Sequence, residues 1–196
     1  MNIKATGLNL LLIVSLMIFS SCIGRKRGEQ QTVREYTPEQ NSLLSNGWEF
    51  PDTVENGELG EEYGVKPIIG LQDNYFDIEV GSGYDVAIKI IDASSNRCIR
   101  YVFVNENNTA TINEIPQGQY YLKIAYGRDW MEKKDSIRLG KFTYNAFYER
   151  SRNVFDFGKK NSQGIINYKL SLRVRKGIGE NNFKTTPINE QEFYKN

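Results

Sequence analysis

The chain has no histidine among its 196 residues, and this absence narrows the chemistry open to it. Histidine is the commonest general base and the commonest zinc ligand in proteins. Its absence excludes serine–histidine and cysteine–histidine nucleophile pairs. A carboxylate-based glycosidase or a serine–lysine hydrolase is still open, but no motif in the sequence supports either. We therefore expect a protein that is not an enzyme and that has no catalytic residues, no metal and no cofactor.

A surplus of charge of either sign is also missing. The chain has 25 basic and 24 acidic residues, and Lys4 is the only charged residue before Cys22. A chain that begins at Cys22 therefore carries equal numbers of both signs. Binding to nucleic acid needs a basic surplus or a basic stripe. We expect no nucleic-acid partner.

Long hydrophobic runs are absent except for one near the start of the chain. Leu10–Phe19 is apolar apart from one serine, follows the basic Lys4 and precedes the small residues Ser20 and Ser21. This order is typical of a secretory signal peptide. The run is shorter than the roughly 18–20 residues that a membrane-spanning helix needs.

Cys22 directly follows these small residues, and the segment resembles the lipobox of bacterial lipoproteins, although Phe19 stands where that family usually has leucine. The resemblance implies that residues 1–21 are a signal peptide and that Cys22 is the lipid attachment site. The relaxed pattern is similar to lipoboxes of the Bacteroidota, and the basic run Arg25–Arg27 suits anionic lipid headgroups. We expect a lipid-anchored protein of the cell envelope, on the periplasmic face of the outer membrane.

If Cys22 is acylated, Cys98 has no cysteine with which to pair. It begins a β-like run, Cys98–Val104, where an unpaired cysteine is usually a small buried apolar residue. A reactive thiol would need exposure and a nearby cation, and Arg97 and Arg100 are neighbours only in sequence. We expect Cys98 to be structural.

Residues 22–74 show no sustained hydrophobic period. Prolines and glycines interrupt them, apolar residues occur singly or in pairs, and acidic residues gather between Glu55 and Glu62. The acidic group lacks the alternating Asp or Asn ligands and the closing glutamate of a calcium loop. We interpret this segment as the lipid anchor followed by a flexible linker.

From Tyr75 onward the hydrophobic period is two, which is typical of antiparallel strands with one buried and one wet face. Four runs share this alternation: 75–80, 85–91, 120–126 and 167–175. Turn residues separate the earlier runs at the spacing of about 8–12 residues expected of a β-sandwich. We expect an all-β antiparallel sandwich over residues 75–176, followed by a polar tail over residues 177–196. The predicted core contains Val86, Ile88, Ile90, Leu122, Ile124, Leu170 and Leu172.

The run Ile115–Ile124, which follows a strand, a loop and Thr111–Ile112, resembles the repeat of PEGA and carboxypeptidase-regulatory-like domains. These domains are Ig-like or prealbumin-like β-sandwiches of secreted and surface proteins. A longer resemblance, from Tyr84 to Thr185, is to uncharacterised secreted proteins and lipoproteins of the Bacteroidota, which share Cys-Ile-Arg-Tyr and Ala-Tyr-Gly-x-Asp-Trp in this order. Both resemblances imply a fold and leave the activity open, because such sandwiches have many functions.

Aromatic side chains gather in and beside the less regular segment 127–148. We expect residues 127–166 to be a long excursion with one or two short strands, the first beginning at Gly140, and segment 127–148 to lie at the surface as a loop. Loops on rigid sandwiches are where binding residues collect. Rings exposed there could stack on a sugar or a peptide. The alternative is that they are core residues, in which sandwiches are rich. The candidate contact residues are Tyr126, Asp129, Trp130, Tyr144 and Tyr148.

Two functions remain open. The first is a non-catalytic envelope lipoprotein that acts as an interaction or assembly module, contacting the membrane through its lipid and a protein or glycan as a further partner. The second is a carbohydrate-binding protein or a carboxylate-based glycoside hydrolase that uses segment 127–148. A concave site with two carboxylates about 5–10 Å apart would favour the hydrolase. A flat, filled sandwich would favour the interaction module.

Overall fold

The computed structural model describes residues 34–158 and 164–195, and its compact unit begins at Tyr36. Strands account for 48% of the described residues and helices for 10%. The predicted all-β sandwich is therefore confirmed. Cys22 lies outside the described residues, so its acylation stays a prediction. Within the described ranges, no helix is long and apolar enough to cross a membrane.

The helices and strands have the following bounds in chain order. They are α1 (Pro38–Ser45), β1 (Gly57–Glu58), the 3-10 helix η1 (Glu61–Tyr63), β2 (Tyr75–Val80), β3 (Asp85–Asp92), β4 (Cys98–Val104), β5 (Thr109–Asn113), β6 (Gly118–Lys133), β7 (Leu139–Ser151), β8 (Phe155–Phe157), β9 (Tyr168–Leu172), β10 (Val174–Arg175), β11 (Ile178–Gly179), β12 (Thr185–Ile188) and α2 (Glu190–Tyr194).

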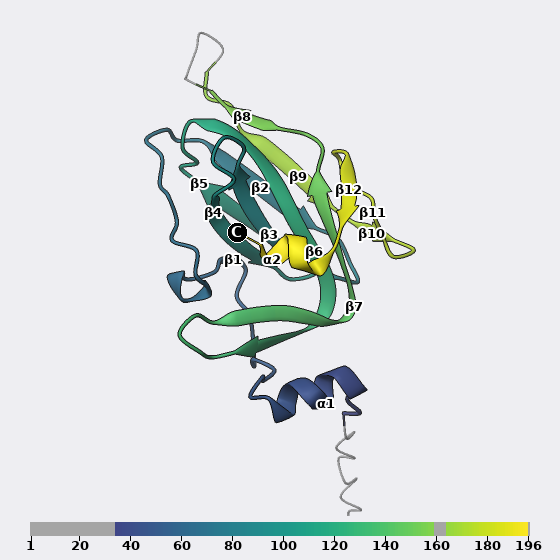
Figure 1. The fold of residues 1–196 in the computed structure, drawn as a ribbon. Coiled ribbons are helices and arrows are strands. Elements are labelled where there is room, and N and C mark those ends of the chain that lie inside the picture. Colours follow the sequence, from purple (N-terminus) through teal and green to yellow (C-terminus); the bar gives the residue numbers. More distant parts are fainter. Residues whose placement is uncertain (1–33, 159–163, 196) are drawn as a thin grey trace, which may run out of the picture. The chain divides into compact units, whose positions relative to one another are not determined.

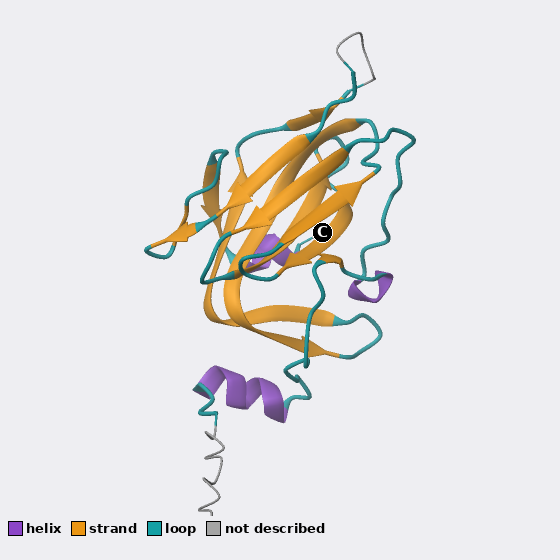
Figure 2. Cartoon of the chain, turned by 180° about the vertical axis from the view of Figure 1, so that it is seen from behind, coloured by secondary structure: helices purple, strands orange, loops and turns teal. Residues whose placement is uncertain are grey.

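Two sheets pack face to face (Figures 1 and 2). The larger has the strand order β1-β4-β3-β6-β7-β12, with β8 also paired to β6, and the smaller has the order β5-β2-β9. The short strands β10 and β11 form a separate hairpin. Among the described residues, every strand pairing is antiparallel except that of β2 with β9, which is parallel.

The inner core lies between the two sheets and follows the alternation read from the sequence. The predicted strand 75–80 coincides with β2, in which Phe76, Ile78 and Val80 are buried. They pack with apolar residues of β3, β4 and β6 on the facing sheet. All seven predicted core residues are at most 2% exposed. The period of two thus located this core correctly.

The larger sheet is buried on its other face as well, by an outer core that the sequence did not predict. All seven residues of β4 are buried, as are the six central residues of β3. Leu59, Val65 and Phe193 cover this second face. Lys89 of β3 alternates with the core residues Ile88 and Ile90, which predicts a wet face for it, but it is only 4% exposed. That expectation was wrong because the covering side chains come from segments with no hydrophobic period of their own.

Part of the segment expected to be a linker, residues 22–74, packs on the sandwich. Helix α1 begins with a capping box between Thr37 and Gln40. The Gln40 side chain is buried and donates to Asp129 Oδ2 at 2.9 Å and to Thr143 Oγ1 at 3.1 Å. These bonds join α1 to the β6–β7 hairpin, which lies beside it in both views (Figures 1 and 2). The prediction of a flexible linker was therefore wrong from α1 onward. Polar side chains attach α1 to the sandwich, and such side chains leave no hydrophobic period in the sequence.

The segment expected to be a polar tail, residues 177–196, supplies β11, β12 and α2 to the compact unit. Phe193 of α2 is fully buried in the outer core. The Lys123 ammonium donates to the carbonyl oxygens of Glu192 and Lys195 at 2.7 and 2.6 Å. Carbonyls at a helix C-terminus lack partners within the helix, so Lys123 satisfies groups that would otherwise be unpaired.

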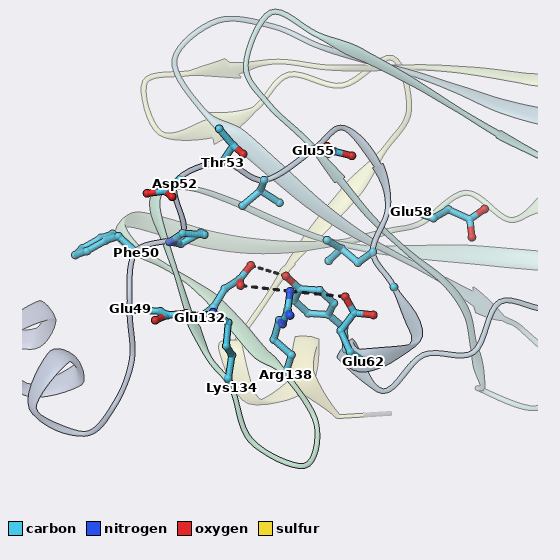
Figure 3. A pocket seen from close by; sticks show the side chains of 15 residues that line it. Glu49, Phe50, Asp52, Thr53, Glu55, Glu58, Glu62, Glu132, Lys134 and Arg138 are labelled. Atoms are coloured by element: carbon cyan, nitrogen blue, oxygen red, sulfur yellow. Dashed lines mark hydrogen bonds and ion pairs between the residues drawn. The ribbon is translucent and has the colours of Figure 1, made fainter.

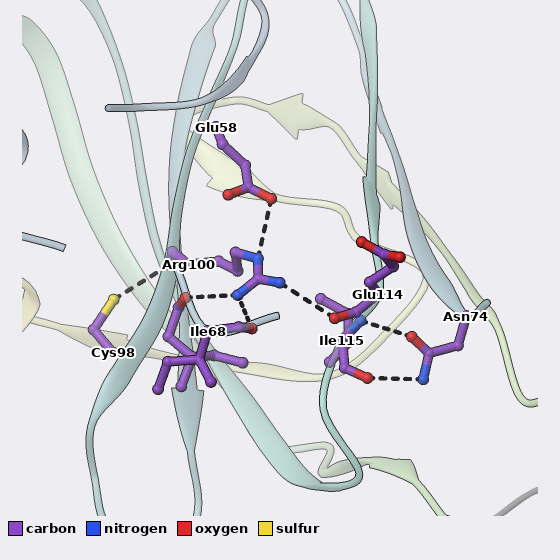
Figure 4. A network of polar contacts seen from close by, with 8 residues as sticks. Glu58, Ile68, Asn74, Cys98, Arg100, Glu114 and Ile115 are labelled. Carbon is purple, nitrogen blue, oxygen red and sulfur yellow. Dashed lines mark hydrogen bonds and ion pairs between the residues drawn. The ribbon is translucent and has the colours of Figure 1, made fainter. Parts of the chain in front are cut away.

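Arg100 of β4 is fully buried and joins several segments around the sheet (Figure 4). Its Nε donates to Glu58 Oε1 at 3.0 Å. Its terminal nitrogens donate to the carbonyl oxygens of Ile68, of Ile99 at 3.0 Å and of Glu114 at 3.3 Å. A buried guanidinium needs such a full set of acceptors. Arg100 therefore fixes β1, the segment that follows η1 and the residue after β5 to the larger sheet.

Segment 127–148, expected to be a surface loop, consists mainly of the paired strands β6 and β7. The alternation breaks there because the register shifts between Tyr126 and Arg128. Asp129 and Asn145 also adopt positive φ angles of 55° and 51°. Such a bulge bends a strand and turns side chains to the other face. The loop prediction was wrong, since the irregular pattern marks a distorted hairpin.

Candidate functional site

Two of the five predicted contact residues are core residues. Trp130 is 5% exposed and packs edge-on against Phe103 and Phe142, with ring centroids 5.1 and 4.9 Å away. Tyr126 is fully buried and stacks on Phe147 at 4.6 Å. The expectation that Tyr126 and Trp130 contact a ligand was wrong, because packing accounts for both rings.

The other three residues make different contacts, although Asp129 directly follows Arg128, the register partner of Tyr144. Asp129 accepts the hydrogen bond from Gln40. Tyr148 packs against Phe193 with a centroid distance of 5.5 Å. Tyr144 is 47% exposed on β7. None of the five predicted residues lines either of the two cavities described next.

The first cavity, here called the acidic cleft, has a volume of about 620 Å³ and a mainly polar lining. It lies between the segment that precedes η1 and the end of the β6–β7 hairpin (Figure 3). The acidic and basic residues that line it are Glu49, Asp52, Glu55, Glu58, Glu62, Glu132, Lys134 and Arg138. Six carboxylates therefore face two cations.

Glu132 is the most deeply buried carboxylate of the acidic cleft, at 4% exposure. Its Oε1 accepts hydrogen bonds from Trp130 Nε1 at 3.0 Å and from the Tyr63 hydroxyl. Its Oε2 lies 3.8 Å from Arg138 Nη1. Burial and the bond to Glu132 raise the pKa of Tyr63 well above its ordinary value, which keeps that donor protonated. Both carboxylate oxygens of Glu132 are thus engaged.

Arg138 links the two walls of the cleft. The same Nη1 atom that approaches Glu132 lies 3.6 Å from Glu62 Oε1, and Figure 3 shows Arg138 between these two carboxylates. The guanidinium also lies over the Tyr63 ring, 5.4 Å from its centroid. Glu49 and Glu132 exchange backbone hydrogen bonds of 2.7 and 2.8 Å. The cleft is therefore held in shape by its own side chains and backbone.

The carboxylates of the acidic cleft are not arranged as the ligands of a metal ion. Among the residues that the structure describes, no group of three or more His, Cys, Asp or Glu side chains could hold a metal ion. The six carboxylates are spread along the cleft walls and do not converge. What the cleft presents is a negatively charged concave surface.

The second cavity, here called the aromatic pocket, adjoins the first, because Tyr63 and Arg138 line both. Its volume is about 420 Å³ and its lining is mainly apolar. The other side chains of its lining include Trp48, Lys89, Tyr101, Ile137, Leu139, Lys141, Glu190 and Tyr194.

Lys89 and Tyr101 form the buried end of the aromatic pocket, each at 4% exposure. The Lys89 ammonium lies 5.3, 5.5 and 5.7 Å from the ring centroids of Tyr101, Phe193 and Tyr194. Burial lowers the pKa of Lys89 and raises that of Tyr101. The buried Tyr101 hydroxyl has no hydrogen-bond partner within the described ranges. No sequence signal pointed to this pocket, since its residues come from positions 48 to 194.

Cys98 is a structural residue, as the sequence predicts. It is 8% exposed, and its thiol donates to the carbonyl oxygen of Arg100 at 3.2 Å. Burial raises the pKa of Cys98 to about 11. A thiol with so high a pKa is a poor nucleophile at neutral pH.

Comparison with known proteins found no matching family model, no matching curated protein and no matching solved structure.

Proposed function

We propose that this chain is a non-catalytic envelope lipoprotein, anchored through Cys22, whose sandwich is an interaction module. In this proposal the acidic cleft receives a cationic segment of a partner protein. The observation that carries it is the charge of the cleft. Six carboxylates line it against two cations that are already paired, and Arg100 pairs with Glu58 from outside the lining. Asp52 and Glu55 form no ion pair with any described residue. They are therefore available to an incoming lysine or arginine.

The state of Glu132 supports a non-catalytic role. A general acid or base must give up or take a proton during the reaction. Glu132 instead accepts hydrogen bonds from Trp130 and Tyr63 and lies beside the Arg138 cation. These contacts engage both carboxylate oxygens, so Glu132 holds the two walls of the cleft together.

The alternative is a carbohydrate-binding protein or a carboxylate-based glycoside hydrolase. The observation in its favour is that Glu62 and Glu132 face the same cleft, within 3.6 and 3.8 Å of one Arg138 atom. Against it, a guanidinium occupies the space between the two carboxylates. The aromatic platform that this alternative needs is also missing at Tyr126 and Trp130, which are buried.

Site-specific photo-cross-linking tests the interaction module. A photoreactive residue replaces the exposed Thr53 at the cleft, or the exposed Asp73 outside its lining as a matched control. In cells that express the full chain, we expect a discrete protein adduct from position 53 and none from position 73. The adduct should disappear in a variant that combines Asp52→Lys with Glu55→Lys. No adduct at position 53, or an adduct that survives both charge reversals, would contradict the proposal.

A further inference from the structure

Tyr101 presents a structural anomaly at the inner end of the aromatic pocket. Its hydroxyl is buried and has no hydrogen-bond partner among the described residues. Leaving a buried hydroxyl unpaired is unfavourable because it has lost its hydrogen bonds to water, so native proteins rarely keep such a group without a use. Tyr101 lines a cavity of about 420 Å³, which is within the size range of small-molecule sites.

The charges around the pocket indicate the sign of a ligand. Three cations, Lys89, Lys141 and Arg138, line it, against the single carboxylate of Glu190. Lys141 bridges to Glu39 and Glu190, and Arg138 to carboxylates of the acidic cleft. Lys89 lies deepest of the three, at 4% exposure and beside the Tyr101 ring. A positive charge and a hydroxyl donor therefore stand at the same buried end.

The remaining walls are apolar and accessible from outside. Trp48 and Tyr194 contribute aromatic rings. Ile137 and Leu139, in and after the connection between β6 and β7, are 49% and 47% exposed. Large exposed aliphatic side chains at the rim of a cavity are typical of a surface that is covered when a ligand binds.

We propose that the aromatic pocket binds a small carboxylate with an aromatic or otherwise apolar body. The carboxylate accepts a hydrogen bond from the Tyr101 hydroxyl and lies near the Lys89 ammonium, and the body lies between Trp48, Ile137 and Leu139. This ligand is separate from the protein partner proposed for the acidic cleft, and Asp52 and Glu55 do not line the aromatic pocket.

The test uses the full chain in lipid nanodiscs, with phenylacetate as the probe and saturation-transfer NMR as the measurement. Empty nanodiscs correct for partition into lipid, and 2-phenylethanol is the uncharged comparison. We expect phenylacetate to bind more tightly than 2-phenylethanol. Affinity should fall about tenfold in Tyr101→Phe and more in Lys89→Met, since hydrogen bonds to charged groups are stronger than those between neutral groups.

Two matched variants lie on the other sheet. Tyr168→Phe also removes a tyrosine hydroxyl, and Lys169→Met also removes a lysine charge, but neither residue lines the pocket. Both should bind phenylacetate as the wild type does. The proposal is overturned if phenylacetate does not bind at about 10 mM, if 2-phenylethanol binds equally well, or if Tyr101→Phe and Lys89→Met leave the affinity unchanged.

The thermal stability of Tyr101→Phe gives a second readout. Because the hydroxyl has no partner in the free protein, its removal should leave the melting temperature unchanged or raise it. Tyr168→Phe should lower it, since the Tyr168 hydroxyl bonds to the backbone of Asp156. A clear loss of stability in Tyr101→Phe would show that the hydroxyl is already paired and would overturn the argument.

Discussion

Glu58 meets the fully buried guanidinium of Arg100 at 3.0 Å, although Glu58 lies on the two-residue edge strand β1 and is itself 30% exposed at its side chain. The pair joins the edge of the larger sheet to its interior. Arg100 also donates to three backbone carbonyls, so it is the centre of a network rather than half of an isolated ion pair.

Arg100→Met should lower the free energy of unfolding by about 3–5 kcal/mol. The substitution leaves several buried acceptors without their donor. Removing only one partner of a buried pair destabilises a protein more than replacing both partners by apolar residues. Urea unfolding followed by circular dichroism measures the change. Arg173→Met is the control, because the Arg173 side chain is 65% exposed and its ion pair contributes little. Equal stability of the two variants would show that the network does not hold the segment around β1.

Trp130→Ala should lower the free energy of unfolding by about 3–5 kcal/mol, through lost burial and the cavity left behind. Tyr144→Ala on the same hairpin should change it by less than about 0.5 kcal/mol, because Tyr144 is 47% exposed. Denaturant unfolding of both variants is the measurement. If Trp130→Ala keeps the wild-type stability, Trp130 is not the packing residue that its contacts with Phe103 and Phe142 indicate.

Cys22→Ser should abolish incorporation of labelled palmitate into the protein. Acylation at this cysteine is what the lipobox resemblance implies, and more than one acyl chain is needed for stable anchoring. Cys98→Ser is the matched control and should still be labelled, since Cys98 is buried. Labelling that persists in Cys22→Ser would rule out this attachment site.

The stability of the chain should fall as the pH rises above about 10. Burial raises the pKa values of Tyr101, Tyr126 and Tyr194 above the ordinary value of 10.0. Near pH 10 these tyrosines therefore lose their protons in the unfolded chain but keep them in the folded chain. Each tyrosine then removes up to about 1.4 kcal/mol per pH unit.

Lys89 acts in the opposite sense, because its pKa is lowered from 10.5. The contribution of Lys89 to the free energy of unfolding rises with pH and is complete above 10.5. Above that pH, ionisation of the tyrosines therefore determines how the stability changes. Urea unfolding at pH 9 to 12 measures the trend, and absorbance at 295 nm reports tyrosine ionisation. Ionisation of all tyrosines near pH 10 in the folded protein would contradict the prediction.

The inner core was predictable because its strands obey one simple rule. β2 alternates between the core and an outer face that is only partly covered, so its polar residues keep the period of two visible. β4 is buried on both faces and its seven residues therefore carry no alternation. The β6–β7 hairpin was mistaken for a loop because a register shift breaks its period near Arg128.

The outer core and both cavities could not be read from the sequence. Leu59, Val65 and Phe193 are single apolar residues within polar stretches, and only the folded sheet brings them together. Lys89 looked like an ordinary outward lysine, since its burial depends on Phe193 and Tyr194, which follow it by more than a hundred positions. Contacts of such long range leave no local pattern.

Phe193 follows every strand of the sandwich in the chain, yet it is fully buried against the outer face of the larger sheet. During synthesis, the part of this face that Phe193 covers stays open after all its strands have emerged, although Leu59 and Val65 precede most of them. A nascent chain that pauses before Phe193 exposes Tyr101 and Tyr148, whose rings pack against Phe193, to the surrounding medium. The protein is therefore most vulnerable to aggregation and proteolysis in the interval between sheet assembly and the docking of α2.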